Sequence, residues 1–168
     1  VFIYRDNYKS ISDLSEKELR LGGLRINPKT NIGSRITFYN NVKIKKLKAK
    51  NGIVNQVKGL PKNPKLSNFS WSPDQTKIAL TNTTSQGVEL WLLDLKTGSA
   101  SKLTKPNLNA NVGSVINWSG DSKSMLVKVI SSNKKPLINT SLIVPDGPTV
   151  STNFGEKVQN RTYQDLLK

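Results

Sequence analysis

One stretch of ten residues recurs in this sequence, and it limits the folds open to the chain more than any other feature does. The stretch WSPDQTKIAL (Trp71–Leu80) matches WSGDSKSMLV (Trp118–Val127) at an offset of 47 residues. The Trp, Ser and Asp coincide, and so do the apolar runs that follow them. Pro73 presets the backbone angle for the second position of a type I turn, and the Asp74 side chain can bond back to the chain. Each copy therefore predicts a strand, a tight turn and a second strand.

A second pairing supplies the other half of the repeating unit. VKIKKLKAKNG (Val42–Gly52) matches VELWLLDLKTG (Val88–Gly98) at an offset of 46 residues. The complete unit then has four short strands in about 40 to 50 residues, which is typical of a β-propeller blade. We predict an all-β chain that forms a partial antiparallel β-propeller of about three WD40-like blades or part-blades. The predicted limits are residues 1–60, 61–105 and 106–145, followed over 146–168 by an extended linker or the start of a new element.

The segment 10–23 (SISDLSEKELRLGG) does not follow the repeat. Ser15 and Glu18 have the spacing of a helix-capping box, and the Gly-Gly pair after them would end a helix. We therefore predict one short helical insertion within the first part-blade. The chain opens on VFIYRD, without a Met, which is typical of the middle of a strand, so we expect a fragment or a processed product.

Composition excludes several kinds of site. The 168 residues include no Cys and no His, so the chain offers no thiolate or imidazole ligand for zinc and no imidazole for a Ser-His-Asp triad. We predict no metal site and no cofactor. The formal net charge is +15, and a basic chain can bind nucleic acid, but no aromatic stacking pattern accompanies the charge, so we expect no such binding. There is also no run of 18 apolar residues that could span a membrane.

The repeat and three further stretches resemble a known family. The repeat is similar to the propeller repeat of prolyl oligopeptidase-type serine peptidases and of TolB-type proteins. ELRLGGLRINPKTN (18–31), LSNFSWSP (66–73) and GPTVSTNFGEKVQNRTYQDLLK (147–168) resemble the N-terminal propeller region of bacterial peptidases of this type, in the branch that includes the plastid glutamyl endopeptidases. That resemblance implies a downstream α/β-hydrolase domain with its nucleophilic Ser in a Gly-x-Ser-x-Gly turn. This sequence contains no such pentapeptide, so no catalytic residue carries over to it.

The aromatic and acidic residues that recur could form a functional site, but the repeat favours a structural role for them. Trp71, Trp91 and Trp118 could form a ligand-binding aromatic set. Since two of them occupy equivalent repeat positions, we expect Trp71 and Trp118 to pack in the core between blades. Asp74 and Asp121 occupy equivalent turns, so we expect them to hold these turns and not to act as catalytic carboxylates.

Arginine gives the sharpest candidates for a substrate contact. Arg25 and Arg35 lie in the region that is specific to the family rather than to the repeat. Arginine binds a carboxylate through two parallel hydrogen bonds, as lysine cannot. If the parent protein prefers acidic residues, we predict that Arg25 or Arg35 meets the substrate carboxylate; the alternative is a structural arginine that bonds loop carbonyls.

Two hypotheses of function follow. In the first, the chain is the propeller segment of an exported bacterial serine peptidase, where it gates access for short or unfolded peptides, adds substrate contacts and leaves catalysis to the hydrolase domain of the same protein. In the alternative, it belongs to a non-enzymatic TolB-type propeller that acts as a protein-interaction scaffold. The periplasmic or extracellular location follows from the family resemblance alone.

Overall fold

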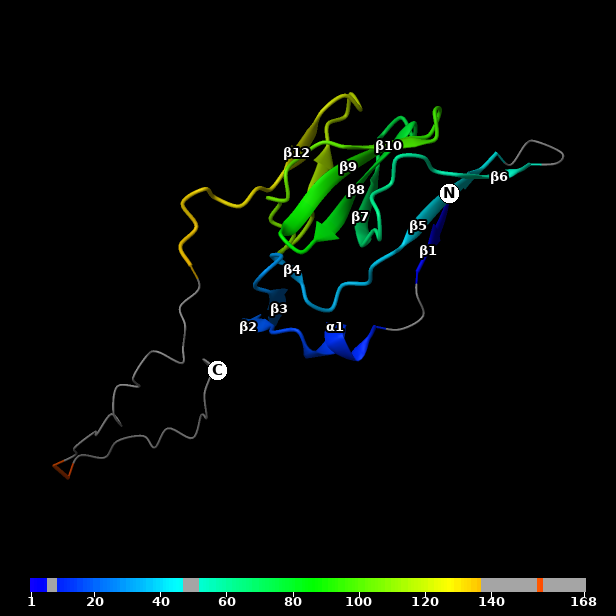
Figure 1. Ribbon diagram of the computed structural model, residues 1–168. Helices are drawn as coiled ribbons and strands as arrows, with labels where there is room; N and C mark the ends of the chain where they lie inside the picture. Colours follow the sequence, from blue (N-terminus) through cyan, green and yellow to red (C-terminus); the bar gives the residue numbers. More distant parts are fainter. Residues whose placement is uncertain (6–8, 47–51, 137–153, 156–168) are drawn as a thin grey trace. The chain divides into compact units, whose positions relative to one another are not determined.

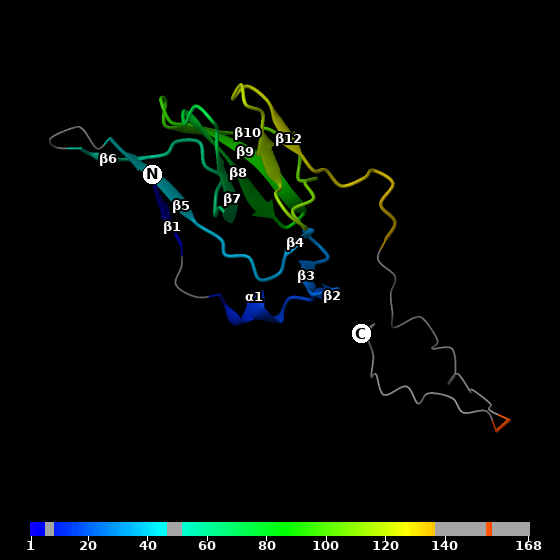
Figure 2. The same ribbon diagram turned by 180° about the vertical axis from the view of Figure 1, so that it is seen from behind.

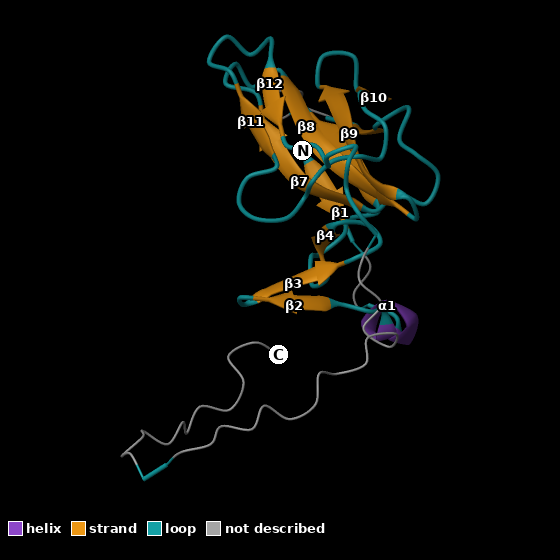
Figure 3. Ribbon diagram, turned by 90° about the vertical axis from the view of Figure 1, so that its left-hand side faces the viewer, coloured by secondary structure: helices purple, strands orange, loops and turns teal. Residues whose placement is uncertain are grey.

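Strands dominate the computed structural model of the chain, which describes residues 1–5, 9–46, 52–136 and 154–155 (Figure 3). The chain divides into two compact units, Val1–Lys134 and Lys135–Lys168. The described strands and helix all belong to the first unit. The predicted end of the third blade and RTYQDLLK lie outside the described residues, as does the predicted linker over 146–168 apart from residues 154–155.

Four antiparallel strands that follow one another in the chain form the central sheet: β7 (Leu66–Trp71), β8 (Lys77–Thr84), β9 (Gly87–Asp94) and β10 (Ser99–Lys102) (Figure 1). Strands β8 and β9 pair from end to end and are joined by the turn Ser85–Gln86. This meander is the four-stranded unit that the repeat predicts.

The next hairpin along the chain repeats the first half of this unit: β11 (Ile116–Trp118) and β12 (Met125–Val127). Trp118 pairs with Met125 as Trp71 pairs with Ile78, so the two hairpins have the same register at the offset of 47 residues. Register decides which side chains reach the core, because a slip by one residue would turn every side chain to the other face. The repeat found in the sequence is therefore a structural repeat.

The two turns of these hairpins are built in the same way. The Asp74 carboxylate accepts hydrogen bonds from the Ser72 hydroxyl (2.6 Å) and the Thr76 backbone N–H (3.1 Å). The Asp121 carboxylate accepts one from the backbone N–H of Lys123 (2.9 Å). These bonds confirm the turn role predicted for both aspartates. The hydrogen bond from Ser72, more than any other contact, lowers the pKa of Asp74 to about 2.

A further sheet has the strand arrangement of the central sheet, except that a long segment takes the place of the turn between its first two strands. It consists of three strands in the order β1-β5-β6: β1 (Phe2–Tyr4), β5 (Asn41–Lys45) and β6 (Val54–Gln56) (Figure 2). Strand β1 pairs with β5 as β8 pairs with β9, but residues 5–40 separate the two strands. We call residues 5–40 the insertion. It contains a helix and a small sheet: α1 (Ile11–Ser15), β2 (Leu19–Leu21), β3 (Leu24–Asn27) and β4 (Ile32–Gly33).

The helix of the insertion is shorter than expected, and other residues cap it. Ser10 is the N-cap, and Asp13 completes a capping box with it. The predicted box of Ser15 and Glu18 is wrong, because Ser15 is the last helical residue and the Glu18 carboxylate binds side chains of the small sheet. The pair Gly22–Gly23 does not end a helix but forms the tight turn between β2 and β3, with φ of 51° and 83°.

The core lies on both faces of the central sheet. One buried cluster includes residues of the central sheet and of the second hairpin: Ile32, Ala79, Val88, Leu90, Leu108, Val115 and Ile116. The other includes residues of the central sheet and of β5: Val42, Val57, Leu66, Ile78, Leu80, Leu93 and Ala100. Neighbouring residues of β8 enter different clusters because successive side chains of a strand point to opposite faces. None of the described sheets closes into a barrel, and their packing confirms the all-β prediction of a partial, propeller-like fold.

The three tryptophans have different surroundings. Trp118 packs against the first cluster and donates its indole N–H to the carbonyl of Ser70 (3.1 Å). Trp91 packs against the second cluster and donates to the Glu89 carboxylate (2.9 Å). Trp71 is 48% exposed, so the expectation that it packs in the core is wrong. It ends the edge strand β7, and the strand that Trp118 contacts has no counterpart beside Trp71 among the described residues.

Candidate binding cleft

A cleft of about 770 Å³ lies between the insertion and one end of the central sheet. Its lining comes from three segments: the insertion, residues 62–65 just before β7, and residues 82–85 at the end of β8. All three belong to the first compact unit. Pockets that bind small ligands have volumes of about 300 to 1,000 Å³, so the cleft is large enough to be a binding site.

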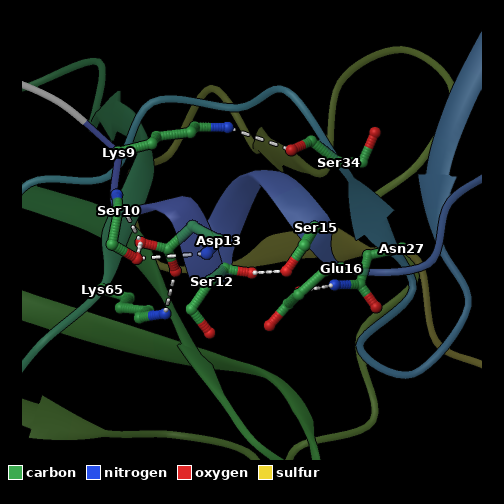
Figure 4. Close-up of polar contacts among 9 residues, drawn as sticks. All are labelled: Lys9, Ser10, Ser12, Asp13, Ser15, Glu16, Asn27, Ser34 and Lys65. Carbon is green, nitrogen blue, oxygen red and sulfur yellow. Dashed lines mark hydrogen bonds and ion pairs between the residues drawn. The ribbon is translucent and has the colours of Figure 1, made fainter.

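The helix α1 forms part of one wall, and its capping box connects it to the central sheet. The Ser10 hydroxyl accepts the backbone N–H of Asp13 (3.1 Å), and the Asp13 carboxylate accepts the backbone N–H of Ser10 (3.1 Å). The Lys65 ammonium, just before β7, lies 3.4 Å from the same carboxylate (Figure 4). The hydrogen bond from the Ser10 hydroxyl lowers the pKa of Asp13, so this carboxylate is charged at neutral pH.

Side chains next to either end of α1 join the helix to the small sheet and to Ser34, the residue that follows it. The Lys9 ammonium donates to the carbonyl of Ser34 (3.0 Å), and the side-chain amide of Asn27 donates to the Glu16 carboxylate, as Figure 4 shows. The Asn27 side-chain oxygen also accepts the backbone N–H of Lys29 (3.0 Å). These contacts fix the turn between β3 and β4 beside the helix.

The same tripeptide, Asn-Pro-Lys, occurs on both sides of the cleft. Asn27-Pro28-Lys29 begins the turn between β3 and β4, and Asn63-Pro64-Lys65 leads into β7. Both lysines line the cleft. This recurrence is a signal in the sequence that could locate the site. The repeat-based interpretation missed it because the two copies lie outside the strands of the blade repeat.

Two buried hydroxyl groups in the cleft lining have no hydrogen-bond partner within the described residues: those of Thr30 and Thr83. Thr30 is 8% exposed and belongs to the insertion, whereas Thr83 is 9% exposed and belongs to β8. The neighbouring Asn82, by contrast, accepts the backbone N–H of Lys65 (3.0 Å) and donates to Glu89 (3.2 Å). An unsatisfied buried hydroxyl costs about 1–3 kcal/mol, and native proteins contain few of them. Each side of the cleft therefore contributes one unused polar group.

The cleft carries a surplus of positive charge. Its lining includes five cationic side chains and two carboxylates: Arg5, Lys9, Lys29, Lys62, Lys65, Asp13 and Glu16. Lys65 pairs with Asp13, and Lys9 is bound to a backbone carbonyl. The ion pairs of the described residues do not involve Arg5, Lys29 or Lys62. The charges of these three side chains are open to an anion.

The predicted contacts Arg25 and Arg35 are not among the residues that line the cleft. The Arg25 guanidinium lies 2.8 Å from the Glu18 carboxylate, which also pairs with Arg20 (3.0 Å) and accepts the Ser34 hydroxyl (2.8 Å). The Ser34 hydroxyl is the main cause of the lowered pKa of Glu18. A substrate carboxylate would have to compete with Glu18 for Arg25. Arg35 is exposed and has no ion pair with the described residues, so its role as a substrate contact stays a prediction.

The cleft lining brings amide, hydroxyl, cationic and carboxylate groups together. The chain has no His, so no imidazole is available there as a general base. The described residues contain no group of three or more His, Cys, Asp or Glu side chains that could hold a metal ion. No helix in the described part of the chain is long and apolar enough to cross a membrane.

Two curated proteins match the chain over its whole length. Both are named "Probable glutamyl endopeptidase, chloroplastic"; one is from Oryza sativa subsp. japonica (32% identical over 180 residues) and the other from Arabidopsis thaliana (33% over 185 residues). The chain spans 19% and 18% of their lengths, about a fifth of each. No family model matches the chain, and no solved structure matches it with statistical significance. The likeness supports a peptidase-related family for this chain.

Proposed function

We propose that the chain is a non-catalytic propeller segment of a serine peptidase of the prolyl oligopeptidase type. One observation supports this most: the whole chain is similar to about a fifth of two proteins named as endopeptidases. The sequence contains neither a His nor a Gly-x-Ser-x-Gly pentapeptide. A Ser-His-Asp mechanism would therefore take its catalytic groups from another part of the protein, the α/β-hydrolase domain that the resemblance implies.

The segment's contribution to such a reaction is to limit access and to hold the peptide. A peptidase gains rate when a bound peptide is kept in the geometry of attack, because the loss of freedom on reaction is then smaller. The cleft between the insertion and the central sheet supports this role, since it offers unused hydroxyl and cationic groups beside a structured wall. An exported bacterial location is part of the same proposal, whereas the two relatives are named as chloroplastic.

A peptidase assay on the full-length protein tests the proposal. We expect it to hydrolyse short or unfolded peptides, and a phosphonofluoridate that modifies reactive serines should abolish this activity. The 168-residue chain alone should hydrolyse none of them. A full-length protein that binds other proteins but has no serine-dependent hydrolysis would contradict the proposal and favour the TolB-type scaffold.

A further inference from the structure

We propose that a β-strand located upstream of Val1 in the full-length protein pairs with the open edge of β1 and covers the ring of Trp71. We call it the upstream strand. Within the described residues, β1 and Trp71 both lack a neighbour that their equivalents in the other sheets have. This inference rests on the proposed function in one respect, because it takes the 168 residues to be a segment of a longer protein.

The sheet of β1, β5 and β6 lacks the equivalent of one strand of the central sheet. Val42 of β5 pairs with Ile3 of β1. Val88 of β9, the match of Val42 at the offset of 46 residues, pairs with Thr83 of β8. Ile3 is therefore the equivalent of Thr83, and β1 is the equivalent of β8. Strand β7 pairs with the second edge of β8, whereas no described strand pairs with the second edge of β1.

The side chains of β1 are apolar and exposed where the complete sheet buries its residues. Phe2 is 45% exposed and Ile3 is 41% exposed. Their equivalents in β8 are only 4% exposed (Asn82) and 9% exposed (Thr83). Burial of apolar surface is favourable, and an exposed apolar edge strand readily pairs with another strand. The composition of β1 therefore favours a covered position.

The backbone of β1 points to the same neighbour. The Val42 carbonyl accepts the N–H of Val57 on the side of β6 (3.3 Å). Opposite residues of an antiparallel pair either bond to each other or both face away, so Ile3 turns its N–H to the open edge. In the central sheet, the equivalent N–H of Thr83 donates to the carbonyl of Lys65, directly before β7 (3.0 Å). The upstream strand would accept the N–H of Ile3 in the same way.

The exposed Trp71 gives an independent reason for the same strand. Its equivalent Trp118 packs against the first core cluster and donates its indole N–H to the carbonyl of Ser70 in β7 (3.1 Å). The sheet of β1 packs on the other face of the central sheet, and its equivalent of β7 is the strand that it lacks. Trp71 would donate to that strand. The 168-residue chain by itself leaves the Trp71 ring 48% exposed, and only the longer protein would cover it.

The order of the strands in the chain assigns the occupant. Strand β7 comes directly before β8, and consecutive strands are usually neighbours in a sheet. Since β7 lies 12 to 17 residues before Thr83, the same spacing places the upstream strand about 12 to 17 residues before Ile3. The chain spans 18–19% of the curated relatives that it matches, so a full-length protein of similar size has enough polypeptide for this strand.

The upstream strand would also support the cleft. Strand β1 leads directly into the insertion at Arg5, which lines the cleft. A strand paired on both edges is held more firmly than an edge strand, because its backbone hydrogen bonds are shielded on both sides. Pairing of β1 with the upstream strand would therefore fix this end of the cleft lining.

Photo-cross-linking in the full-length protein identifies the neighbour of Trp71. p-Benzoylphenylalanine takes the place of Trp71, and mass spectrometry after irradiation and digestion locates the cross-link. We expect the main cross-link at residues about 12 to 17 before Ile3. The same photoreactive residue in place of Lys96, in the exposed turn after β9, is the control and should not reach this segment. Cross-links from position 71 to another segment or to a second copy of the protein, or none at all, would overturn the inference.

Hydrogen exchange of single amides tests the open edge without a substitution. In the full-length protein, the N–H of Ile3 should exchange within about tenfold of the rate of the Thr83 N–H, because both are bonded to a neighbouring strand. An Ile3 N–H that exchanges more than about tenfold faster than that of Thr83 would mean that the edge of β1 stays open, and this would also overturn the inference.

These measurements are independent of peptidase activity. The expected cross-link and a protected Ile3 N–H in a protein without serine-dependent hydrolysis would support the inference and contradict the proposed function. Serine-dependent hydrolysis by a protein whose β1 edge is open would do the reverse.

Discussion

The two copies of the tryptophan-and-turn stretch, Trp71–Leu80 and Trp118–Val127, share a local structure and differ in their surroundings. Their strands pair in the same register, and each turn holds one non-glycine residue in the left-handed region, Gln75 at φ 57° and Ser122 at φ 59°. The tryptophan of the first copy is exposed, whereas that of the second packs against a core cluster. The local sequence is enough to set the turn, but the neighbouring strand decides what is buried.

Contacts between the copies explain this difference. The Trp118 indole donates to the carbonyl of Ser70, and the backbone N–H of Asp74 donates to the Ser122 hydroxyl (3.0 Å). The second hairpin therefore packs on the first through the Trp118 ring at the Ser70 carbonyl of β7 and through the contact between the two turns. Since the described residues place no earlier copy of this stretch beside the first, Trp71 makes no equivalent contact.

Replacing the two tryptophans should show the largest difference in stability between the two copies. We expect Trp118→Ala to lower the free energy of unfolding by about 2–4 kcal/mol, because it removes core contacts and a hydrogen bond. Trp71→Ala should cost less than about 1 kcal/mol, since half of its surface is already exposed. Urea unfolding followed by far-UV circular dichroism measures both values.

Trp118→Phe is the control for this pair. It keeps an aromatic ring against the core and removes only the indole N–H, so the loss should be about 1 kcal/mol. Equal losses for the two alanine variants would contradict the difference in packing between the copies.

The pKa values of the two turn aspartates give a second comparison between the copies, with a smaller expected effect. The folded-state pKa of Asp74 is about 2, below its ordinary value of 3.8, and that of Asp121 is lowered in the same direction. Each carboxylate therefore stabilises the fold fully above about pH 4, and this contribution is lost as the pH falls through the folded-state pKa. NMR titration of the side-chain carboxyl carbons measures both values.

Ser72→Ala separates the two aspartates. It removes the main cause of the low pKa of Asp74, so that pKa should rise toward 3.8 while the pKa of Asp121 stays where it is. An unchanged pKa for Asp74 would show that the hydroxyl of Ser72 does not hold the first turn.

The smallest expected effect concerns the left-handed residue of each turn. Gln75→Gly should raise the free energy of unfolding by about 0.5–1 kcal/mol, because glycine adopts this conformation without a steric cost. Ser122→Gly removes the same steric cost, but it also removes the hydroxyl that accepts the Asp74 N–H. Its free energy of unfolding should therefore be unchanged or lower. Thermal unfolding in parallel checks the pair, and the same gain in both variants would mean that the bond between the turns contributes nothing.

These regions also show what the sequence can and cannot predict. The strands of the two hairpins and the turn aspartates follow from residues close together in the chain, and the predictions for them are confirmed. The burial of Trp71 depends on a neighbouring strand, which the repeat alone does not provide. The predicted helix cap is wrong because Ser10 with Asp13 and Ser15 with Glu18 both have the spacing of a capping box, and the contact of Glu18 with the small sheet decides between them.

The cleft is the least predictable feature, because it is assembled from segments far apart in the sequence. Thr30 and Thr83 line the same cleft only because the insertion lies beside the end of β8. Nothing in the periodicity of either segment marks a threonine as unsatisfied. The two Asn-Pro-Lys tripeptides are visible in the sequence, but their meeting at one site requires the fold.

The most direct test of the account is steady-state kinetics of the full-length protein carrying Lys29→Gln/Lys62→Gln. If this chain contributes substrate contacts and no catalytic group, KM for an acidic peptide should rise about tenfold while kcat and KM for a neutral peptide stay within about twofold. A fall in kcat for both peptides with KM unchanged would contradict the account, because it would assign these residues to the chemical step.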